Sequence, residues 1–98
     1  IEEYLLNSKG EKVFASYLRQ LILGVNEEFH NAVLRSQFKQ ESGGKLNFQI
    51  QLINKEHAEK ILAQLANELR KGLGLELEGK VVDSILQEKG KFKFLIRG

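Results

Sequence analysis

The stretch that decides the fold is Lys45–Gly72, with the sequence KLNFQIQLINKEHAEKILAQLANELRKG. Its first part alternates apolar and polar side chains, the period of two expected when one face of a strand is buried and the other is exposed. The apolar positions of this strand are Leu46, Phe48, Ile50 and Leu52. Asn54 can end the strand and cap a helix, because its side-chain oxygen can accept a hydrogen bond from a free amide in the first helical turn.

A helix is predicted directly after Asn54, since apolar residues then recur every three or four positions and form one stripe. The stripe consists of Ala58, Ile61, Leu62, Leu65, Ala66 and Leu69. Gly72 stands where a residue in the left-handed conformation commonly ends a helix. Leu73–Glu78 alternates again and predicts a second strand, which a right-handed crossover through the helix would place parallel to the first.

A longer helix is predicted upstream, from Glu11 to Phe38, where apolar residues also return every three or four positions. It would be about 40 Å long, more than a domain of this size needs, so we expect it to lean against another protein. Ser42–Gly44 is expected to close this helix with a turn. Ile1–Leu6 is expected to be the end of a preceding helix, which Asn7–Gly10 interrupts.

The last third of the chain is less regular. Gly79–Gly90 fits either a short helical turn or a strand end near Val82 followed by a loop, and we favour the strand end. Lys91–Arg97 alternates strictly and predicts a third strand at a sheet edge, where lysines discourage pairing with another chain. A three-stranded sheet leaves an apolar edge, so we expect a domain that is cut short or completed by a partner.

The expected fold class is therefore α/β (α+β), with a long N-terminal helix followed by a small mixed three-stranded sheet and one crossover helix. The element order is helix, strand, helix, strand, strand. Residues 1–44 would form the long helix and its turn, continuing an upstream coiled coil. Residues 45–98 would form the small α/β domain, and the two parts together would make one compact unit.

Composition limits the function classes. The chain has 98 residues with 42% hydrophobic and 29% charged side chains, which argues against disorder. No apolar run approaches the roughly 20 residues that cross a bilayer. The 15 basic and 13 acidic side chains are mixed along the chain, so the net charge of +2 creates no strong electrostatic field that would attract nucleic acid or lipid. Cysteine is absent, which excludes disulfides and thiol chemistry.

No motif predicts an enzyme, a cofactor or a metal. His30 and His57 have neither a cysteine nor a second histidine at ligand spacing, and no pair of acidic residues stands out. The GxG of Gly72–Gly74 follows a helix instead of preceding one, which is the wrong order for a phosphate site. Ser42–Lys45 lacks the leading glycine and the following helix of a P-loop. We therefore expect a non-catalytic protein.

A nucleic-acid-binding domain is the alternative. The strand from Lys91 to Arg97 interleaves cations with two aromatic residues, as a platform for single strands would: Lys89, Lys91, Lys93, Arg97, Phe92 and Phe94. Strict alternation places the lysines and the phenylalanines on opposite faces, however, which favours a half-buried strand. An enzyme or ligand-binding domain is a third hypothesis, and an apolar pocket with converging polar groups would be its sign.

From Lys45 onward the chain resembles the carboxy-terminal domain of the E-type stalk protein of V-type and A-type ATPases, and more distantly the flagellar export regulator FliH. The resemblance rests on the strand, cap and helix of residues 46–69 and on a short later set of residues: Gly72, Leu73, Gly74, Leu75, Glu76, Leu77, Ile85, Gly90, Phe92, Phe94 and Ile96. It covers about two thirds of the chain. Lys91 departs from the family pattern, in which glycine directly precedes the aromatic residue.

The resemblance implies a non-catalytic component of the peripheral stalk, or stator, of a rotary proton- or sodium-translocating ATPase. Such a protein would be cytoplasmic, peripheral to a membrane complex and not inserted in the bilayer. Its partners would be a second stalk protein, through a coiled coil, and subunits of the catalytic ring. The expected interface residues, which pack against the sheet, a partner helix or the ring, are Phe14, Leu18, Leu21, Val25, Phe29, Lys91, Lys93 and Arg97.

Overall fold

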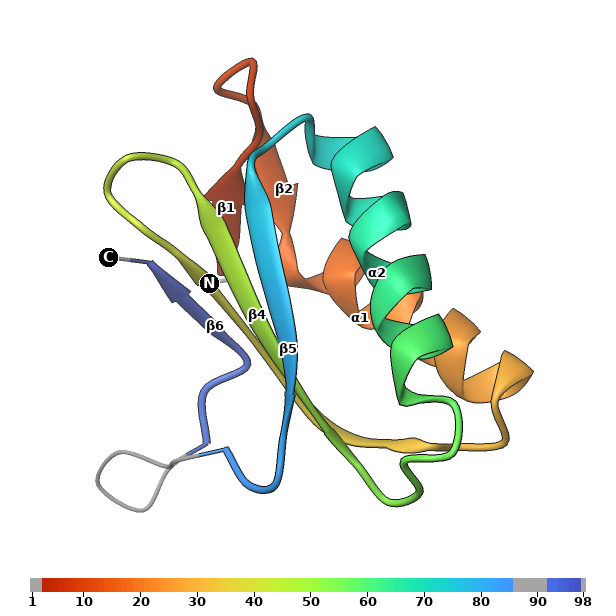
Figure 1. The fold of residues 1–98 in the computed structure, drawn as a ribbon. Helices are drawn as coiled ribbons and strands as arrows, with labels where there is room; N and C mark the ends of the chain where they lie inside the picture. Colours follow the sequence, from red (N-terminus) through yellow and green to blue (C-terminus); the bar gives the residue numbers. More distant parts are fainter. Residues whose placement is uncertain (1–2, 86–91, 98) are drawn as a thin grey trace.

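A mixed sheet of four strands lies at the centre of the computed structural model, which describes residues 3–85 and 92–97 (Figure 1). Its strands, in chain order, are β3 (Val33–Gln40), β4 (Leu46–Leu52), β5 (Leu77–Val82) and β6 (Leu95–Arg97). The order across the sheet is β5-β4-β3-β6. β3 and β4 are antiparallel, whereas β5 runs parallel to β4 and β6 runs parallel to β3.

Both helices cover the same face of this sheet, as Figure 1 shows. They are α1 (Ala15–Glu28) and α2 (Ala58–Leu73). A separate two-stranded hairpin, β1 (Tyr4–Leu6) and β2 (Lys12–Phe14), precedes α1. The described part of the chain is therefore an α+β fold with one sheet face covered by helices, called the closed face below, and one face without a helix, called the open face.

The core forms between the closed face and the helices because the apolar positions of each element point the same way. On β4 every second residue is buried, and on α2 the buried side chains recur at helical spacing: Ile61, Leu65, Leu69 and Leu73. Phe48 on β4 lies directly over Gly79 of β5, where a Cβ atom would come within 2.1 Å of the ring. Only glycine fits beneath this ring.

Several predictions from residues 45–97 are confirmed. The strand at residues 46–52 is present with the predicted buried face, and α2 connects it to a parallel strand. β6 lies at a sheet edge as expected and occupies the last part of the predicted strand; Lys91 lies outside the described residues. No helix among the described residues is long and apolar enough to cross a bilayer.

Three finer predictions for this region are wrong. Asn54 does not cap α2; its side-chain oxygen accepts a hydrogen bond from the amide of Glu56 at 2.9 Å, and the helix starts later, at Ala58. Gly72 is inside the last turn of α2, and Gly74, with φ of 64°, is the left-handed residue that ends it. Because the helix is longer, β5 begins at Leu77 and not at Leu73.

The long N-terminal helix from Glu11 to Phe38 is also wrong, because this segment forms β2, α1 and β3. The described structure spans only 36 × 33 × 22 Å, which leaves no room for a helix of that length. α1 ends where His30 and Asn31 both have positive φ, 57° and 59°, a conformation that stops a helix and that Asn and His adopt more readily than most residues. The side-chain amide of Asn26 then forms two hydrogen bonds with the backbone of Val33. Its oxygen accepts from the Val33 N–H at 2.9 Å, and its nitrogen donates to the Val33 carbonyl oxygen at 3.4 Å.

β3 gives the sheet its fourth strand, where the sequence predicted three. It pairs with β4 over the full length of both strands, apart from an irregular register between Val33 and Arg35. The segment of residues 1–44 thus contributes a central strand to the same sheet as residues 45–97.

Candidate functional site

The outer side of the β1–β2 hairpin carries aromatic, aliphatic and cationic side chains that the core does not use. Leu5 is fully buried and Val13 packs partly against the core, so the alternate residues of both strands face outward. We call these outward residues, together with Arg97 of β6 that reaches them, the hairpin patch: Tyr4, Leu6, Lys12, Phe14 and Arg97. Leu6 is 37% exposed and Phe14 is 41% exposed, so part of each apolar side chain is accessible to a partner.

Tyr4 is the centre of the hairpin patch. Its ring lies 6.1 Å from the ring of Phe14 in an edge-to-face arrangement, which is a favourable geometry for two aromatic rings. The guanidinium carbon of Arg97 lies 4.5 Å from the centroid of the Tyr4 ring, and the Lys12 ammonium lies 4.7 Å from it. Hydrogen bonding and then charge from the Arg97 guanidinium, with a smaller contribution from the charge of Lys12, lower the pKa of the Tyr4 phenol from its usual value, because they favour the phenolate.

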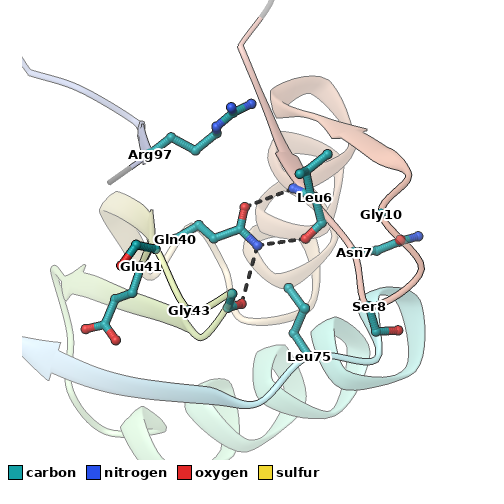
Figure 2. Close-up of a pocket in the computed structure, with 11 residues that line it drawn as sticks. Leu6, Asn7, Ser8, Gly10, Gln40, Glu41, Gly43, Leu75 and Arg97 are labelled. Atoms are coloured by element: carbon teal, nitrogen blue, oxygen red, sulfur yellow. Dashed lines mark hydrogen bonds between the residues drawn. The ribbon is translucent and has the colours of Figure 1, made fainter.

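The hairpin is held firmly to the rest of the fold. Gln40, at the end of β3, is only 6% exposed and bonds both main-chain groups of Leu6 with its side-chain amide (Figure 2). Its oxygen accepts from the Leu6 amide at 2.9 Å, and its nitrogen donates to the Leu6 carbonyl oxygen at 2.7 Å. The Ser8 amide donates to the carbonyl oxygen of Leu73 at 2.9 Å and so ties the hairpin loop to the end of α2.

The hairpin loop is also ordered internally. The side-chain oxygen of Asn7 accepts from the amides of Lys9 and Glu11, each at 2.9 Å, and Gly10 adopts a positive φ of 78°. These bonds fix the direction in which the two strands leave the loop. The outward side chains of the hairpin are therefore presented on a support that several hydrogen bonds hold in place.

Two hollows flank the hairpin. One, of about 440 Å³, lies between the hairpin loop and the β3–β4 turn, with Gln40 in its wall and Leu6 and Arg97 at its border (Figure 2). The other, of about 320 Å³, lies between the start of α1 and the end of α2 and is lined by Lys12, Val13, Phe14, Ser16, Tyr17, Gly72 and Leu73. Tyr17 is 39% exposed and lies against Gly72, which leaves no space for a Cβ atom there. Phe14 and Tyr17 thus border one hollow beside the hairpin, and Leu6 borders the other.

The eight interface residues predicted from sequence fall into three groups. Leu18 and Val25 are buried in the core of this chain, and Leu21 and Phe29 pack partly against it, so these four side chains pack on the protein's own sheet and helices. Phe14 and Arg97 meet at the Tyr4 ring in the hairpin patch. Lys93 is exposed on the approach to β6, where its carbonyl oxygen accepts from the side chain of Gln37 at 3.0 Å, and Lys91 lies outside the described residues.

Tyr4, Leu6 and Lys12 were missed by the sequence analysis. A signal for them exists: two short alternating segments, Tyr4–Leu6 and Lys12–Phe14, flank Asn7–Gly10, which is the composition of a hairpin turn. Strands of three residues are too short for their alternation to outweigh the helical spacing that continues into α1. The contact between Tyr4 and Arg97 spans the whole chain and has no local signal.

The open face of the sheet is the second surface with unassigned polar side chains. Its cations among the described residues include Arg35, Lys39, Lys45 and Lys80, and amide side chains lie between them: Gln37, Asn47, Gln49 and Gln51. A hollow of about 310 Å³ on this face is bordered by Lys39, Lys80, Asn47 and Gln49. The two carboxylates on its border are engaged, since Glu78 pairs with Lys45 at 3.0 Å and Glu41 accepts from Asn47 at 2.7 Å.

The two histidines occupy unrelated places. His30 is exposed in the turn after α1, and the His57 ring lies 5.7 Å from the ring of Phe29 at the start of α2. Within residues 3–85 and 92–97, no three or more His, Cys, Asp or Glu side chains are grouped so that they could hold a metal ion. The hairpin patch and the open face are therefore the two surfaces on which a function can be argued from positive features.

Comparisons with known proteins add no relative to this picture. No protein-family model matches the chain, and neither the curated proteins nor the solved structures contain a match. The peripheral-stalk hypothesis accordingly rests on the residues quoted for it and on the surfaces described above.

Proposed function

We propose that this chain is a non-catalytic interaction domain that binds a partner protein through the hairpin patch. One observation carries the proposal: Phe14 and Arg97, both expected at an interface from the sequence, converge on Tyr4 on the outer side of the hydrogen-bonded hairpin. Tyrosine, phenylalanine and arginine are enriched at protein interfaces, and tyrosine and arginine are enriched among the residues that contribute most to binding.

The arrangement of the patch favours binding because its side chains are already ordered. The edge-to-face contact of Tyr4 with Phe14 and the two cations on the Tyr4 ring restrict rotamers before any partner arrives. Binding a partner therefore costs less conformational entropy of these side chains. Immobilising one flexible side chain at an interface typically costs about 0.5–1.5 kcal/mol. Lys12 and Arg97 at the border favour a partner whose matching surface is apolar in the middle and acidic at its rim.

We further propose that the partner belongs to the peripheral stalk or catalytic ring of a rotary ATPase, as the resemblance from Lys45 onward implies. The succession of β4, α2 and β5 supports this, because strand, helix and short strand are the elements on which the resemblance rests. The surface that would attach the chain to its partner differs from the one expected from the sequence. Leu18 and Val25 are buried, so attachment would run through the hairpin patch and not through a helical stripe from Val13 to Phe38.

The experiment is copurification with the tagged protein as it occurs in its source cell. We expect subunits of the rotary ATPase to accompany the wild-type protein and to be lost with Phe14→Ser and with Arg97→Glu. Leu23→Ser is the matched control, because Leu23 is 52% exposed on α1 and its loss removes a similar apolar side chain away from the hairpin. Circular dichroism would confirm that all three variants are folded.

The two parts of the proposal fail separately. If other proteins copurify and depend on Phe14 and Arg97, the interaction domain stands and the ATPase assignment is wrong. If the same partners remain bound to both patch variants, the hairpin patch is not the interface.

Nucleic-acid binding is a second candidate, and the open face favours a different location for it than the sequence did. Arg97 is engaged with Tyr4, and the Phe94 ring packs 5.3 Å from the ring of Phe38, so these two residues do not form one exposed platform. Phe92 is 37% exposed and has the Arg35 guanidinium carbon 5.6 Å from its ring centroid, which adds an aromatic residue and a cation beside the open face. Lys39 and Lys80 instead border an amide-lined hollow.

The test of this candidate is oligonucleotide binding at several salt concentrations. Binding through Lys39 and Lys80 would weaken steeply with salt, since each phosphate contact releases counterions. It would be lost with Lys39→Glu and Lys80→Glu but kept with Lys60→Glu on the exposed side of α2. Equal binding by all three variants would exclude the open face as the site.

A further inference from the structure

β5 is an edge strand whose outer main-chain groups have no partner among the described residues. The sheet order places β4 on one side of β5, and no described strand lies on its other side. The amide of Leu46 on β4 donates to the carbonyl oxygen of Glu76 at 2.9 Å. Main-chain groups alternate in direction along a strand, so Glu76, Glu78 and Lys80 bond toward β4. Leu77, Gly79 and Val81 must then direct their N–H and C=O groups outward.

We propose that β5 pairs with β5 of a second copy of this chain, in antiparallel orientation, about a twofold axis at Gly79. Such a contact is isologous, so each residue number pairs with its mirror around 79. Gly79 would face Gly79 of the second copy, and Leu77 would face Val81. All three outward residues of each copy would then exchange hydrogen bonds, which is the hydrogen-bonded type of antiparallel pair.

The charges on β5 select this register. With the axis at Gly79, Glu78 of each copy lies opposite Lys80 of the other in a pair without main-chain bonds, where side chains approach most closely. A shift of the axis to Glu78 would place two glutamates opposite each other, and a shift to Lys80 would place two lysines opposite each other. The sequence of β5 is thus complementary to itself in one antiparallel register.

The closed-face side of β5 fits the same arrangement. Leu77, Gly79 and Val81 are only partly buried in the single chain, although Leu77 and Val81 pack against the core cluster. In the paired form Leu77 of one copy would cover Val81 of the other. Gly79 adds no side chain at the axis, and the Phe48 ring fills the space above it. Pairing of β5 with β5 would therefore continue both the hydrogen-bonded sheet and the apolar closed face across the two copies.

One strand pair buries less than the roughly 1,000 Å² of a stable interface, so the dimer should be weak and depend on concentration. Sedimentation equilibrium from about 10 µM to about 1 mM would detect it. We expect Glu78→Lys and Lys80→Glu each to weaken dimerisation about tenfold or more, since each turns two attractive cross-strand pairs into repulsive ones. The double variant E78K/K80E restores both cross-strand pairs and should dimerise more strongly than either single variant; the Lys45–Glu78 pair within the chain is lost in E78K and in the double variant alike, so E78K is its matched reference.

Two further variants separate the edge from other surfaces. Lys93→Glu changes the charge on the approach to β6, at the opposite edge of the sheet, and should leave dimerisation unchanged. Val81→Pro removes an outward N–H that the single chain does not use, so it should abolish the dimer while the circular dichroism spectrum stays that of a folded protein. A wild-type protein that remains monomeric at about 1 mM would overturn the proposal. Single reversals without effect, or a double variant that fails to recover, would equally overturn it.

Discussion

The two faces of the sheet use the same strands for opposite purposes. On β4, Phe48 and Ile50 point to the closed face and are at most 1% exposed, whereas Asn47 and Gln49 between them point to the open face and remain accessible. The closed face holds the fold together through apolar burial. The open face offers cations, amides and a shallow hollow that folding does not need. Alternate side chains of β4 thus serve different roles: those on the closed face stabilise the fold, and those on the open face are available for binding.

The sharpest test of this separation is truncation of neighbouring residues on β4. Phe48→Ala should destabilise the protein by about 3–5 kcal/mol, because it removes a buried aromatic ring and leaves a cavity. Gln49→Ala should change stability by less than about 0.5 kcal/mol, as surface substitutions usually do. Urea unfolding followed by circular dichroism would measure both. Comparable losses from the two variants would contradict the separation of the faces.

A second test concerns the contact between Phe48 and Gly79. Gly79→Ala should destabilise by about 1–3 kcal/mol, because the added methyl group overlaps a ring that cannot move in a closely packed core. The same substitution in a Phe48→Leu background should cost clearly less, since leucine leaves room above residue 79. A double-mutant cycle from urea unfolding gives the coupling energy. Additive effects would show that the ring does not limit residue 79.

Gln40 and Ser36 are buried polar residues on the closed face, and Gln40 is the one that holds the hairpin. Gln40→Leu should destabilise by about 1–3 kcal/mol, because the N–H and C=O of Leu6 would lose their partner in a partly buried place. Hydrogen exchange should then accelerate most in β1 and β2. Gln37→Leu is the matched control, since Gln37 donates a hydrogen bond to the Lys93 carbonyl oxygen at the exposed surface. Uniform acceleration throughout the sheet would argue that Gln40 does not act on the hairpin locally.

The open face gives a smaller, pH-dependent effect. The Lys45 ammonium, by hydrogen bonding and by charge, lowers the pKa of the Glu78 carboxyl. Folding therefore favours the ionised carboxylate, and this stabilisation is present above the unfolded pKa and is lost as pH falls through the folded pKa. Lys45→Gln should return the pKa of Glu78 toward its usual value and flatten the acid limb of stability. Carboxyl titration by nuclear magnetic resonance would measure the pKa, and an unchanged value would exclude Lys45 as its cause.

The hairpin patch gives the smallest effect at neutral pH. Arg97→Gln should raise the pKa of Tyr4 toward its usual value, because the main cation beside the phenol is removed. Since folding favours the phenolate, the wild-type protein gains this stabilisation only in alkaline solution and loses it as pH falls through the folded pKa. The protein has two tyrosines, so ultraviolet titration in a Tyr17→Phe background would report Tyr4 alone. An identical titration curve in both proteins would contradict the proposed contact.

Sequence reasoning succeeded where one period applied to a whole element. β4 alternates without interruption and α2 keeps one apolar stripe, so both were identified, and their order then implied the parallel pairing with β5. β3 was missed because its inward face contains Ser36 and Gln40 beside Phe38, which hides the alternation. Its apolar residues also continued the helical spacing of α1, and no proline or glycine between Val25 and Phe38 marked the change.

For the candidate site, sequence reasoning identified Phe14 and Arg97 but assigned them to different interfaces. They meet only because β6 returns beside β3 and because Gln40 holds the hairpin at the end of that strand. Tyr4, which joins them, lies in a strand of three residues. Local periodicity carries no information about the pairing of β6 with β3 or about the contact between Gln40 and the hairpin.

The sequence by itself determined the central strand, the crossover helix and the absence of an apolar segment long enough to cross a bilayer, because each follows from the spacing of neighbouring side chains. Only the tertiary structure decided where α1 ends, that residues 33–40 form a strand, and which exposed residues share a surface. The reason is physical: a polar residue such as Gln40 can occupy a buried position once a partner such as Leu6 satisfies its hydrogen bonds, and that partner lies 34 positions away in the chain.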